Sequence, residues 1–205
     1  MEKIDFKKSL IDYRGKKNIL VEVKIPPRKY LMIDGKGDPN KSPEFQLSIE
    51  ALYPIAYKLK FASKIDLKKD YVVMPLEGLW WSKDMTSFTT ARDKSKWDWT
   101  LMIHQPEWIT KSMFQEIVKK VSLKSPPKLL EEVRFETLKE NLCVQTLHVG
   151  SFDDEGEILE KMHCQYIPEN KLQLTGKHHE IYLSDFRKVK TDKLRTILRQ
   201  PVLRV

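Results

Sequence analysis

The sequence predicts one α+β domain that contains two related halves. Its 205 residues are 40% hydrophobic and 32% charged, which suits a single buried core under a strongly solvated surface. Strand-like and helix-like runs alternate, and the order strand, helix, strand occurs twice at a separation of about 110 residues. We expect one domain over residues 1–205, whose halves, at about 18–125 and 126–205, join into one sheet with a cleft.

The first half begins with a polar lead-in of about 28 residues, which ends at the strand-like run ILVEVKI and a Pro-Pro pair. RKYLMIDGKG then predicts a strand. Ser42 predicts a helix start, and apolar residues at helical spacing extend this helix to about Ser63, with a disturbance at Pro54. YVVMPLEGLWW and WDWTLMIH predict paired strands with a long polar loop between them, and a helix follows from Thr110 to about Leu123.

The second half follows the turn SPPK. VRFETL and CVQTLHVG predict strands, DDEGEILEKMHCQY predicts a helix with an acidic start, and HHEIYLSD predicts a further strand. We expect a short basic helix at the carboxyl terminus.

Composition excludes several classes of partner. The formal net charge is +8, but basic residues alternate with acidic ones, as in DLKKDY, and no DNA-reading motif is present, so we expect no nucleic-acid partner. No apolar run reaches about 18 residues and the amino terminus is charged, which predicts no membrane span and a cytoplasmic location. Cys143 and Cys164 are expected to be reduced, buried fillers.

The known motifs of cofactor and metal chemistry are missing. The segment from Gly35 to Ser42 approaches a phosphate-binding loop, but Asn40 replaces a glycine, Pro39 removes an N–H donor and Asp38 adds negative charge. The five histidines and two cysteines lack the spacing of a metal site, and no nucleophile motif occurs. We therefore expect no metal and no cofactor.

Four of the five tryptophans lie in two neighbouring strand runs, Trp80 and Trp81 in one, Trp97 and Trp99 in the other. Buried indole N–H groups need partners, and flat indole faces suit planar ligands, so the cluster predicts the wall of a binding pocket. A plain aromatic core is the alternative.

Acidic residues accompany this wall. The two-residue period of HHEIYLSD places His178, Glu180, Tyr182 and Ser184 on one face of a strand. A carboxylate that faces a partly dry cavity suits general-base work or the binding of a cation, and Glu77 in PLEGLWW offers the same choice. The alternative is a solvated strand face.

The chain resembles the GyrI-like small-molecule-binding domain family, which also supplies the effector-binding part of multidrug-responsive transcription regulators. The resemblance covers most of residues 18–205 and is carried by YLMIDGKGDPN, YKLKF, YVVMPLEGLWW, GKHHEIYLSD and KLRTILRQPV. It implies a tandem βαββ duplication with an antiparallel sheet and a central ligand cleft. Pro54 and Phe186 depart from the family pattern in shape more than in chemistry. The lead-in is too short for a DNA-reading domain, so direct transcriptional control is not expected.

The long-loop, stand-alone members that this sequence is most similar to are cyclopropyl hydrolases, which open the cyclopropane ring of cyclopropanoid genotoxins. This likeness implies a cofactor-independent detoxifying hydrolase in which Glu180 directs a water molecule and Tyr182 stabilises developing charge. The expected contacts of the planar, hydrophobic substrate are Glu77, Trp80, Trp81, Trp97, Trp99 and His178. A module that only sequesters a drug or metabolite and a protein-binding inhibitor remain alternatives, and the oligomeric state is not predicted.

Overall fold

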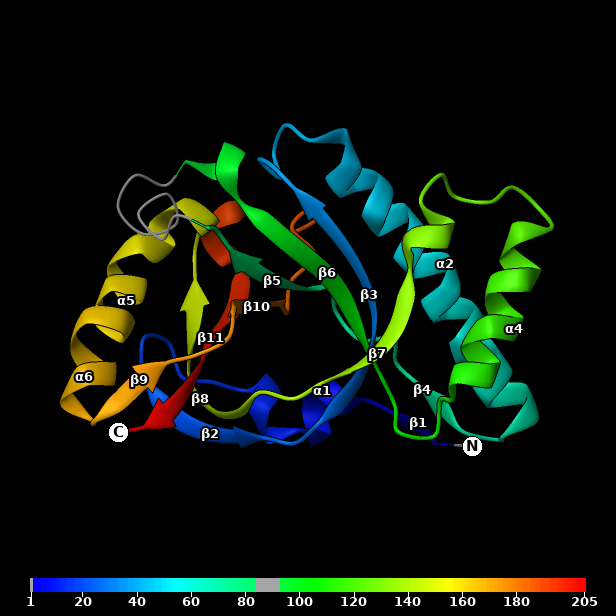
Figure 1. The fold of residues 1–205 in the computed structure, drawn as a ribbon. Helices are drawn as coiled ribbons and strands as arrows, with labels where there is room; N and C mark the ends of the chain where they lie inside the picture. The colour runs from blue at the N-terminus through cyan, green and yellow to red at the C-terminus, as the bar shows by residue number, and fades with distance from the viewer. Residues whose placement is uncertain (1, 84–92) are drawn as a thin grey trace.

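The computed structural model describes residues 2–83 and 93–205. Helices and strands alternate along this part of the chain (Figure 1). The strands are β1 (Lys3–Ile4), β2 (Val21–Ile25), β3 (Arg28–Lys36), β4 (Asp70–Tyr71), β5 (Glu77–Trp81), β6 (Asp98–Gln105), β7 (Arg134–Leu138), β8 (Asn141–Val149), β9 (Leu172–Leu174), β10 (His178–Tyr182) and β11 (Arg195–Arg204). The α-helices are α1 (Phe6–Ser9), α2 (Pro43–Asp66), α4 (Lys111–Ser122), α5 (Gly156–Glu160) and α6 (Ile167–Glu169).

Nine of the described strands form one sheet, whose order is β2-β8-β11-β10-β5-β6-β3-β7, with β9 paired to β11. Strands β5 and β10 pair at its centre; β6 and β3 follow on one side, and β11 and β8 on the other. The units β3-α2-β5-β6 and β8-α5-β10-β11 therefore occupy matching places in an antiparallel sheet. The predicted α+β fold with a tandem βαββ arrangement is confirmed.

The strand that precedes each unit in the chain pairs with the first strand of the other unit. Strand β2, which precedes the first unit, pairs with β8, and β7, which precedes the second unit, pairs with β3. Both outer strands of the sheet therefore cross from one unit to the other.

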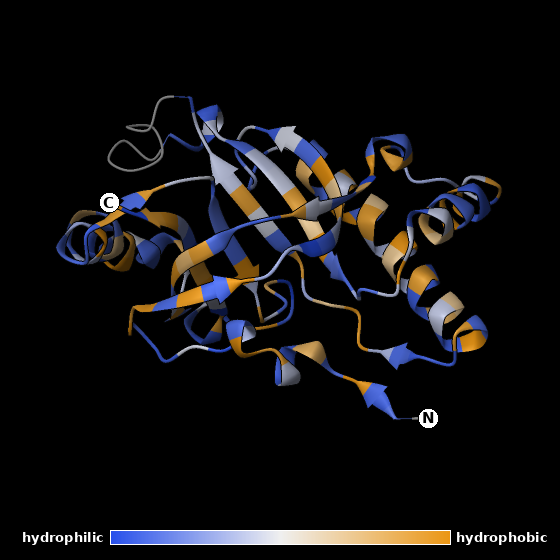
Figure 2. Ribbon diagram, turned by 60° about the horizontal axis from the view of Figure 1, so that its bottom comes forward, coloured by the Kyte–Doolittle hydropathy of each residue, from blue (hydrophilic) through white to orange (hydrophobic). Residues whose placement is uncertain are grey.

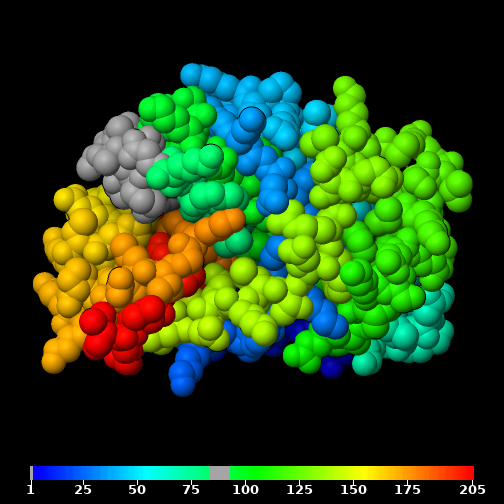
Figure 3. Space-filling view, in the orientation of Figure 1, coloured from blue at the N-terminus to red at the C-terminus, as the bar shows by residue number. Residues whose placement is uncertain are grey.

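Helices cover the sheet at two separate places. Helix α2 packs on β3 and β6 and carries α4 on its outer side. The second helical layer consists of α5, the π-helix η5 (Lys161–Tyr166) and α6, and packs on β8 and β11 through apolar side chains such as Ile158, Met162 and Leu198. Figures 1 and 3 show the two helical layers at opposite sides of the molecule. Figure 2 shows alternating polar and apolar bands along the central strands, the pattern of a sheet with two different faces.

The structure corrects the prediction of a short basic helix at the carboxyl terminus. Residues Arg195–Arg204 form β11, a central strand between β8 and β10. The basic residue in its middle, Arg199, is fully buried, so its charge serves an internal ion-pair network and is no sign of a solvated helix. The lead-in also contributes to the core, since Asp12 and Tyr13 are buried.

Other elements differ from expectation in extent. Helix α2 continues through Pro54 and ends three residues beyond the predicted Ser63. Of the run YVVMPLEGLWW, Glu77–Trp81 lies in the main sheet and Tyr71 lies in the small pair of β1 with β4. Residues 84–92 of the predicted polar loop lie outside the described residues.

Trp99 occupies space that Gly35 leaves open. The two residues are paired in register across β3 and β6, and Trp99 is completely buried. A Cβ atom at Gly35 would lie 2.0 Å from Cη2 of the indole, far inside van der Waals contact. The absence of a side chain at residue 35 therefore lets the sheet seat an indole beneath α2.

We predict that Gly35→Ala destabilises the fold by about 1–3 kcal/mol, because the added methyl group overpacks against the Trp99 ring. Urea unfolding followed by circular dichroism measures this change. In a Trp99→Leu background the same substitution should cost much less, as expected for residues in contact. An equal cost in both backgrounds would show that the ring is not the cause.

Candidate functional site

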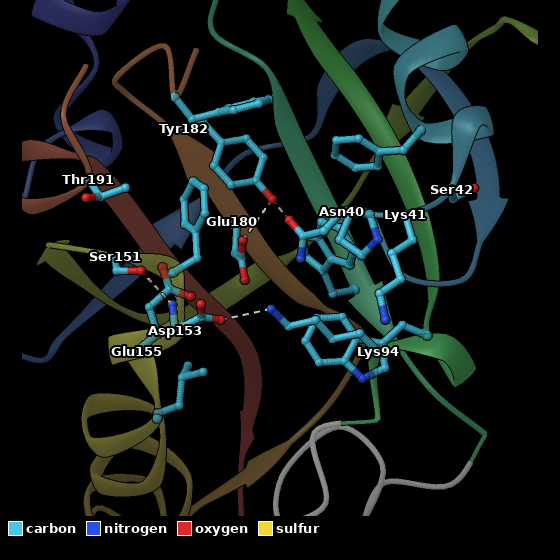
Figure 4. A pocket seen from close by; sticks show the side chains of 18 of the residues that line it. Asn40, Lys41, Ser42, Lys94, Ser151, Asp153, Glu155, Glu180, Tyr182 and Thr191 are labelled. Carbon is cyan, nitrogen blue, oxygen red and sulfur yellow. Dashed lines mark hydrogen bonds and ion pairs between the residues drawn. The ribbon is translucent and has the colours of Figure 1, made fainter. Parts of the chain in front are cut away.

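A cavity of about 1030 Å³ opens between the two helical layers. Its floor comes from β5 and β10, and its walls come from the start of α2, the turn η4 (Phe152–Glu155), α5 and η5. Figure 4 shows Glu180 and Tyr182 directed into this space from β10. Its volume lies near the upper end of roughly 300–1,000 Å³, the usual range of small-molecule sites.

A chain of hydrogen bonds crosses the cavity floor. The indole Nε1–H of Trp80 donates to the hydroxyl oxygen of Tyr182 at 3.0 Å, and this hydroxyl donates to Oε2 of Glu180 at 2.8 Å. Glu180 and Tyr182 share a face because they are two residues apart on β10, and β5 supplies Trp80 from the neighbouring strand. The carboxylate is therefore held in place by side chains from both halves.

Gly78 makes room for this chain. It lies opposite Glu180 in the register of β5 with β10. A Cβ atom there would lie 2.7 Å from Nε1 of Trp80 and 3.2 Å from the Tyr182 hydroxyl. Any larger residue at this position would push apart the two groups that position the carboxylate.

Burial and the neighbouring Glu180 carboxylate hold the pKa of Tyr182 well above its ordinary value of 10.0. The phenol therefore stays protonated at neutral pH and acts as a hydrogen-bond donor.

One histidine borders the carboxylate, and a second packs against the first. Nε2 of His178 lies 3.6 Å from Oε1 of Glu180, and the ring of His163 meets that of His178 edge to face at 6.1 Å. His163 lines the cavity from η5, where burial lowers its pKa to about 4. It is therefore neutral at physiological pH.

Aromatic side chains build the apolar part of the cavity wall. Trp80 stacks with Phe45 of α2 at a centroid distance of 6.1 Å and meets Trp97 edge to face at 5.8 Å. Phe152 of η4 meets the ring of Tyr182 edge to face at 5.6 Å. Aromatic side chains from both halves of the chain thus line the cavity.

The charged lining residues are unevenly distributed. The second half contributes Asp153, Glu155 and Glu160 in addition to Glu180, whereas the first half contributes Lys41 and Lys94. Nζ of Lys94, from the first half, forms an ion pair with Oδ1 of Asp153, from the second half, at 2.9 Å, and Figure 4 shows this contact as a dashed line.

The structure separates the predicted site residues into three groups. Those that line the cavity are Glu180, Tyr182, Trp80 and Trp97. His178 lies beside Glu180 without being among the lining residues, and Trp99 is enclosed against Gly35. Trp81 and Glu77 are on the opposite face of the sheet: Trp81 packs under Nζ of Lys177, 3.1 Å from the ring centroid, and Glu77 is fully buried.

Sequence reasoning missed several lining residues because they come from turns and helix ends. Phe45, Phe152 and Phe186 belong to segments whose meeting point depends on the tertiary fold. Cys164 also lines the cavity and is exposed, which corrects its prediction as buried filling; Cys143 is buried in β8 as expected. Among these segments, only residues 151–155 carried a sequence pattern that could have indicated a lining element: SFDDE is typical of a capped helix start, and it follows a predicted strand.

Comparison with protein-family models matches residues 21–203 to the GyrI-like small molecule binding domain. The chain belongs to this family. The match agrees with a fold whose two units enclose a cavity of the size that small molecules occupy.

Solved structures from Listeria innocua match the GyrI-like chain along nearly its whole length. One, described as an uncharacterized conserved protein, has 37% sequence identity and a TM-score of 0.89, and the match covers 98% of this chain and 100% of that one. Another, described as a hydrolase, has 36% identity and a TM-score of 0.85 with the same coverage.

The carboxyl-terminal domain of EcmrR shares the GyrI-like fold at 12% identity and a TM-score of 0.56, over 91% of this chain and 98% of that one. A search among curated proteins finds no match. Within residues 2–83 and 93–205, no helix is long and apolar enough to cross a membrane, and no group of three or more metal-binding side chains gathers.

The opposite face of the GyrI-like sheet holds a buried ion-pair network around His179. Its Nδ1 lies 2.9 Å from Oε1 of Glu140, and its Nε2 lies 2.9 Å from Oε2 of Glu77. Glu77 also accepts a 2.6 Å hydrogen bond from the Tyr13 hydroxyl, and Arg199 donates to Glu140 at 3.3 Å. The partners of Glu77 named here, His179 and Tyr13, are buried side chains of the core. Its carboxylate therefore takes part in the buried network and does not line the cavity.

This network predicts how stability depends on pH. The charges of His179 and Arg199 hold the pKa of Glu140 at about 2, below its ordinary 4.5, despite its burial. The contribution of the Glu140 carboxylate to the free energy of unfolding is therefore present above pH 4.5 and is lost as the pH falls toward 2. The carboxylate of Glu140 raises the pKa of His179 against the effect of burial, so its contribution is present below pH 6.5 and is lost as the pH rises through the raised value.

We expect Glu140→Gln to lower the free energy of unfolding by about 3–5 kcal/mol near pH 6, because it removes the buried carboxylate that His179 and Arg199 share and leaves them only Glu77 and Asp12 as acidic partners. The acid-side loss of stability should also flatten in this variant. Urea titrations between pH 6 and pH 2 measure both effects. Glu136→Gln, which affects an exposed pair with Arg134, is the control and should cost less than about 1 kcal/mol; similar costs would contradict the role of the network.

The placement of the tryptophans predicts which of them affect ligand binding. Trp97→Ala should weaken the binding of a planar apolar probe, 2-naphthamide, by roughly tenfold, because it removes a cavity wall. Trp81→Ala removes the same side chain from the opposite face and should leave the affinity unchanged. Isothermal titration calorimetry gives both dissociation constants, and equal weakening would refute the assignment of this cavity as the ligand site.

Proposed function

We propose that this GyrI-like protein is a cofactor-independent hydrolase that adds water to the cyclopropane ring of a planar aromatic, cyclopropanoid compound. The observation that carries the proposal is the Glu180 carboxylate, only 12% exposed, which Tyr182 holds at the floor of an aromatic cavity. The Listeria innocua relative described as a hydrolase, 36% identical over nearly the whole chain, supports a hydrolytic activity.

Binding in this proposal depends on the aromatic wall. The substrate's flat ring system would stack beside Trp80, Trp97 and Phe45, which places the strained ring above Glu180. Its conjugated carbonyl group makes the cyclopropane ring electrophilic, so little further activation is needed.

In the reaction, the oxygen of a water molecule forms a bond to a cyclopropane carbon while the C–C bond to the spiro carbon breaks. The water proton passes to Glu180, and the released electron pair moves through the conjugated ring onto the carbonyl oxygen. That oxygen takes up a proton and becomes a phenol, while Glu180 releases to solvent the proton that it received, so the product is the substrate plus one water. No oxidant or reductant is required.

Tyr182 would act in two stages. Before the reaction its hydroxyl donates to Oε2 of Glu180, so the water would be oriented by Oε1, the oxygen that lies 3.6 Å from Nε2 of His178. Once Glu180 has taken a proton, its hold on the phenol weakens, and the hydroxyl can donate to the negatively charged substrate oxygen instead. Trp80 donates to Tyr182 and keeps the ring in position throughout.

A second candidate is a module that binds and sequesters a cationic aromatic compound. Four acidic side chains against two lysines among the lining residues favour it, since a delocalised cation would pair with Glu180 over indole faces. In this case the same cavity would bind its ligand and release it unchanged.

We expect Glu180→Gln to lower the rate of water addition by about 10² to 10⁴-fold while the affinity for the compound changes little, because the amide keeps the shape but cannot take a proton. Mass spectrometry of a spirocyclopropyl-cyclohexadienone incubated with each protein measures the water-added product. Glu160→Gln is the matched control, because this acid lines the same cavity but lies outside the chain of Trp80, Tyr182 and Glu180.

Full activity in Glu180→Gln would remove this residue from the mechanism. Tight binding without any product in the native protein would reject the hydrolase and favour the sequestering module.

A further inference from the structure

A second, smaller cavity of about 180 Å³ adjoins the proposed active site. Its walls come from one side of α2, the segment between β4 and β5, and the turn that follows β10. Tyr182 and Phe186 line both cavities, and no other described residue does. These two aromatic side chains therefore form the partition between the two spaces.

The two halves of the partition are held differently. Tyr182 is fixed by hydrogen bonds to Glu180 and from Trp80, on a central strand. Phe186 is half-buried in the turn after β10, and its ring makes edge contacts with Phe152 and Tyr182 at centroid distances of 6.3 and 6.5 Å. Phe186 is thus the part of the partition that can change without disturbing the hydrogen-bonded floor.

The backbone around Phe186 does not depend on its ring. Asp185 accepts hydrogen bonds from Nε and Nη2 of Arg187 at 2.9 and 3.0 Å, and its carbonyl oxygen accepts from the amides of Lys188 and Val189. The turn is therefore closed by contacts on either side of residue 186. Removal of the ring should open space and leave the turn in place.

The size of the second cavity indicates what it would admit. An enclosed apolar cavity of about 150 Å³ accommodates a benzene molecule, so by volume alone the 180 Å³ of this open cavity of mixed polarity corresponds to about one further aromatic ring. Met74, Leu76 and Tyr53 supply apolar surface, and Ser184 and Arg187 offer polar partners at the outer side.

We propose that Phe186 is the residue that limits substrate length: it closes the end of the main cavity beside Tyr182 and excludes ligands that extend by one ring in that direction. This inference rests on the proposed function for the identity of the site, but its geometry concerns binding and is independent of turnover. The ligand class is aromatic, and Phe186→Ala would admit one further aromatic ring past Tyr182 into the second cavity.

The test compares two probes that differ by one ring, 2-naphthamide and N-benzyl-2-naphthamide, by isothermal titration calorimetry. The native protein should gain little affinity from the added ring, because Phe186 keeps that ring out of the second cavity. Phe186→Ala should shift the ratio of the two affinities toward the longer probe by roughly tenfold or more, with little change for the shorter one. Phe186→Leu serves the same purpose if the alanine variant fails to fold.

Two further variants separate this effect from general loosening. Leu159→Ala enlarges the main cavity at its α5 wall, away from the partition, and should leave the ratio unchanged. Val73→Phe, which fills the second cavity, should restore the native ratio when combined with Phe186→Ala. Equal shifts in Leu159→Ala and Phe186→Ala, no shift in either, or failure of Val73→Phe to reverse the change would overturn the proposal.

The same experiment distinguishes this inference from the proposed hydrolysis. A changed binding ratio together with no detectable product would uphold the role of Phe186 and reject the hydrolase. Product formation by the native protein with an unchanged ratio in Phe186→Ala would uphold the hydrolase and reject the role of Phe186.

Discussion

Strands β5 and β10 pair at the centre of the sheet in a register that sets Glu180 opposite Gly78 and His179 opposite Leu79. This register decides which side chains face the cavity and which face the buried network. A shift of one residue would exchange the two sets, placing His179 in the cavity and Glu180 in the core. The aromatic wall, the hydrogen-bonded carboxylate and the internal ion pairs all depend on this single alignment.

The buried network on the far face explains how the register is specified. His179 contacts Glu77, which is on the neighbouring strand, and Glu140, which precedes β8. Buried charges are costly unless each one has a partner, so a misaligned β10 would leave acids and a base unpaired. Tyr13, which donates to Glu77, and Asp12, which accepts from Arg199, add contacts from the amino-terminal segment, outside the part matched by the family. The network therefore favours this register of β10 over registers shifted by one residue. The same register directs Glu180 and Tyr182 into the cavity on the other face.

Local pattern was sufficient to predict much of the architecture from the sequence. The order of elements, the α+β class and the shared face of Glu180 and Tyr182 follow from periodicities of two and 3.6 residues, which are local properties. The assignment of residues 195–204 failed because Arg199 has the charge of a surface residue and its partners, Gln145 and Glu140, are more than fifty positions away. For the same reason the sequence offered no way to tell that Glu77 faces His179 and not the ligand space, or that Gly35 and Gly78 exist to admit indole rings.

The crossed outer strands have a consequence for how the molecule forms. Since β2 completes the sheet of the second unit and β7 completes that of the first, neither unit finds all its neighbours within its own stretch of chain. Either unit alone would expose a bare strand edge, a surface that invites aggregation. Folding must therefore bring together segments more than a hundred residues apart before either sheet edge is covered, and long-range pairing of this kind slows folding. In evolutionary terms, the two units form an interlocked pair that can be duplicated or inherited together but not readily exchanged one at a time.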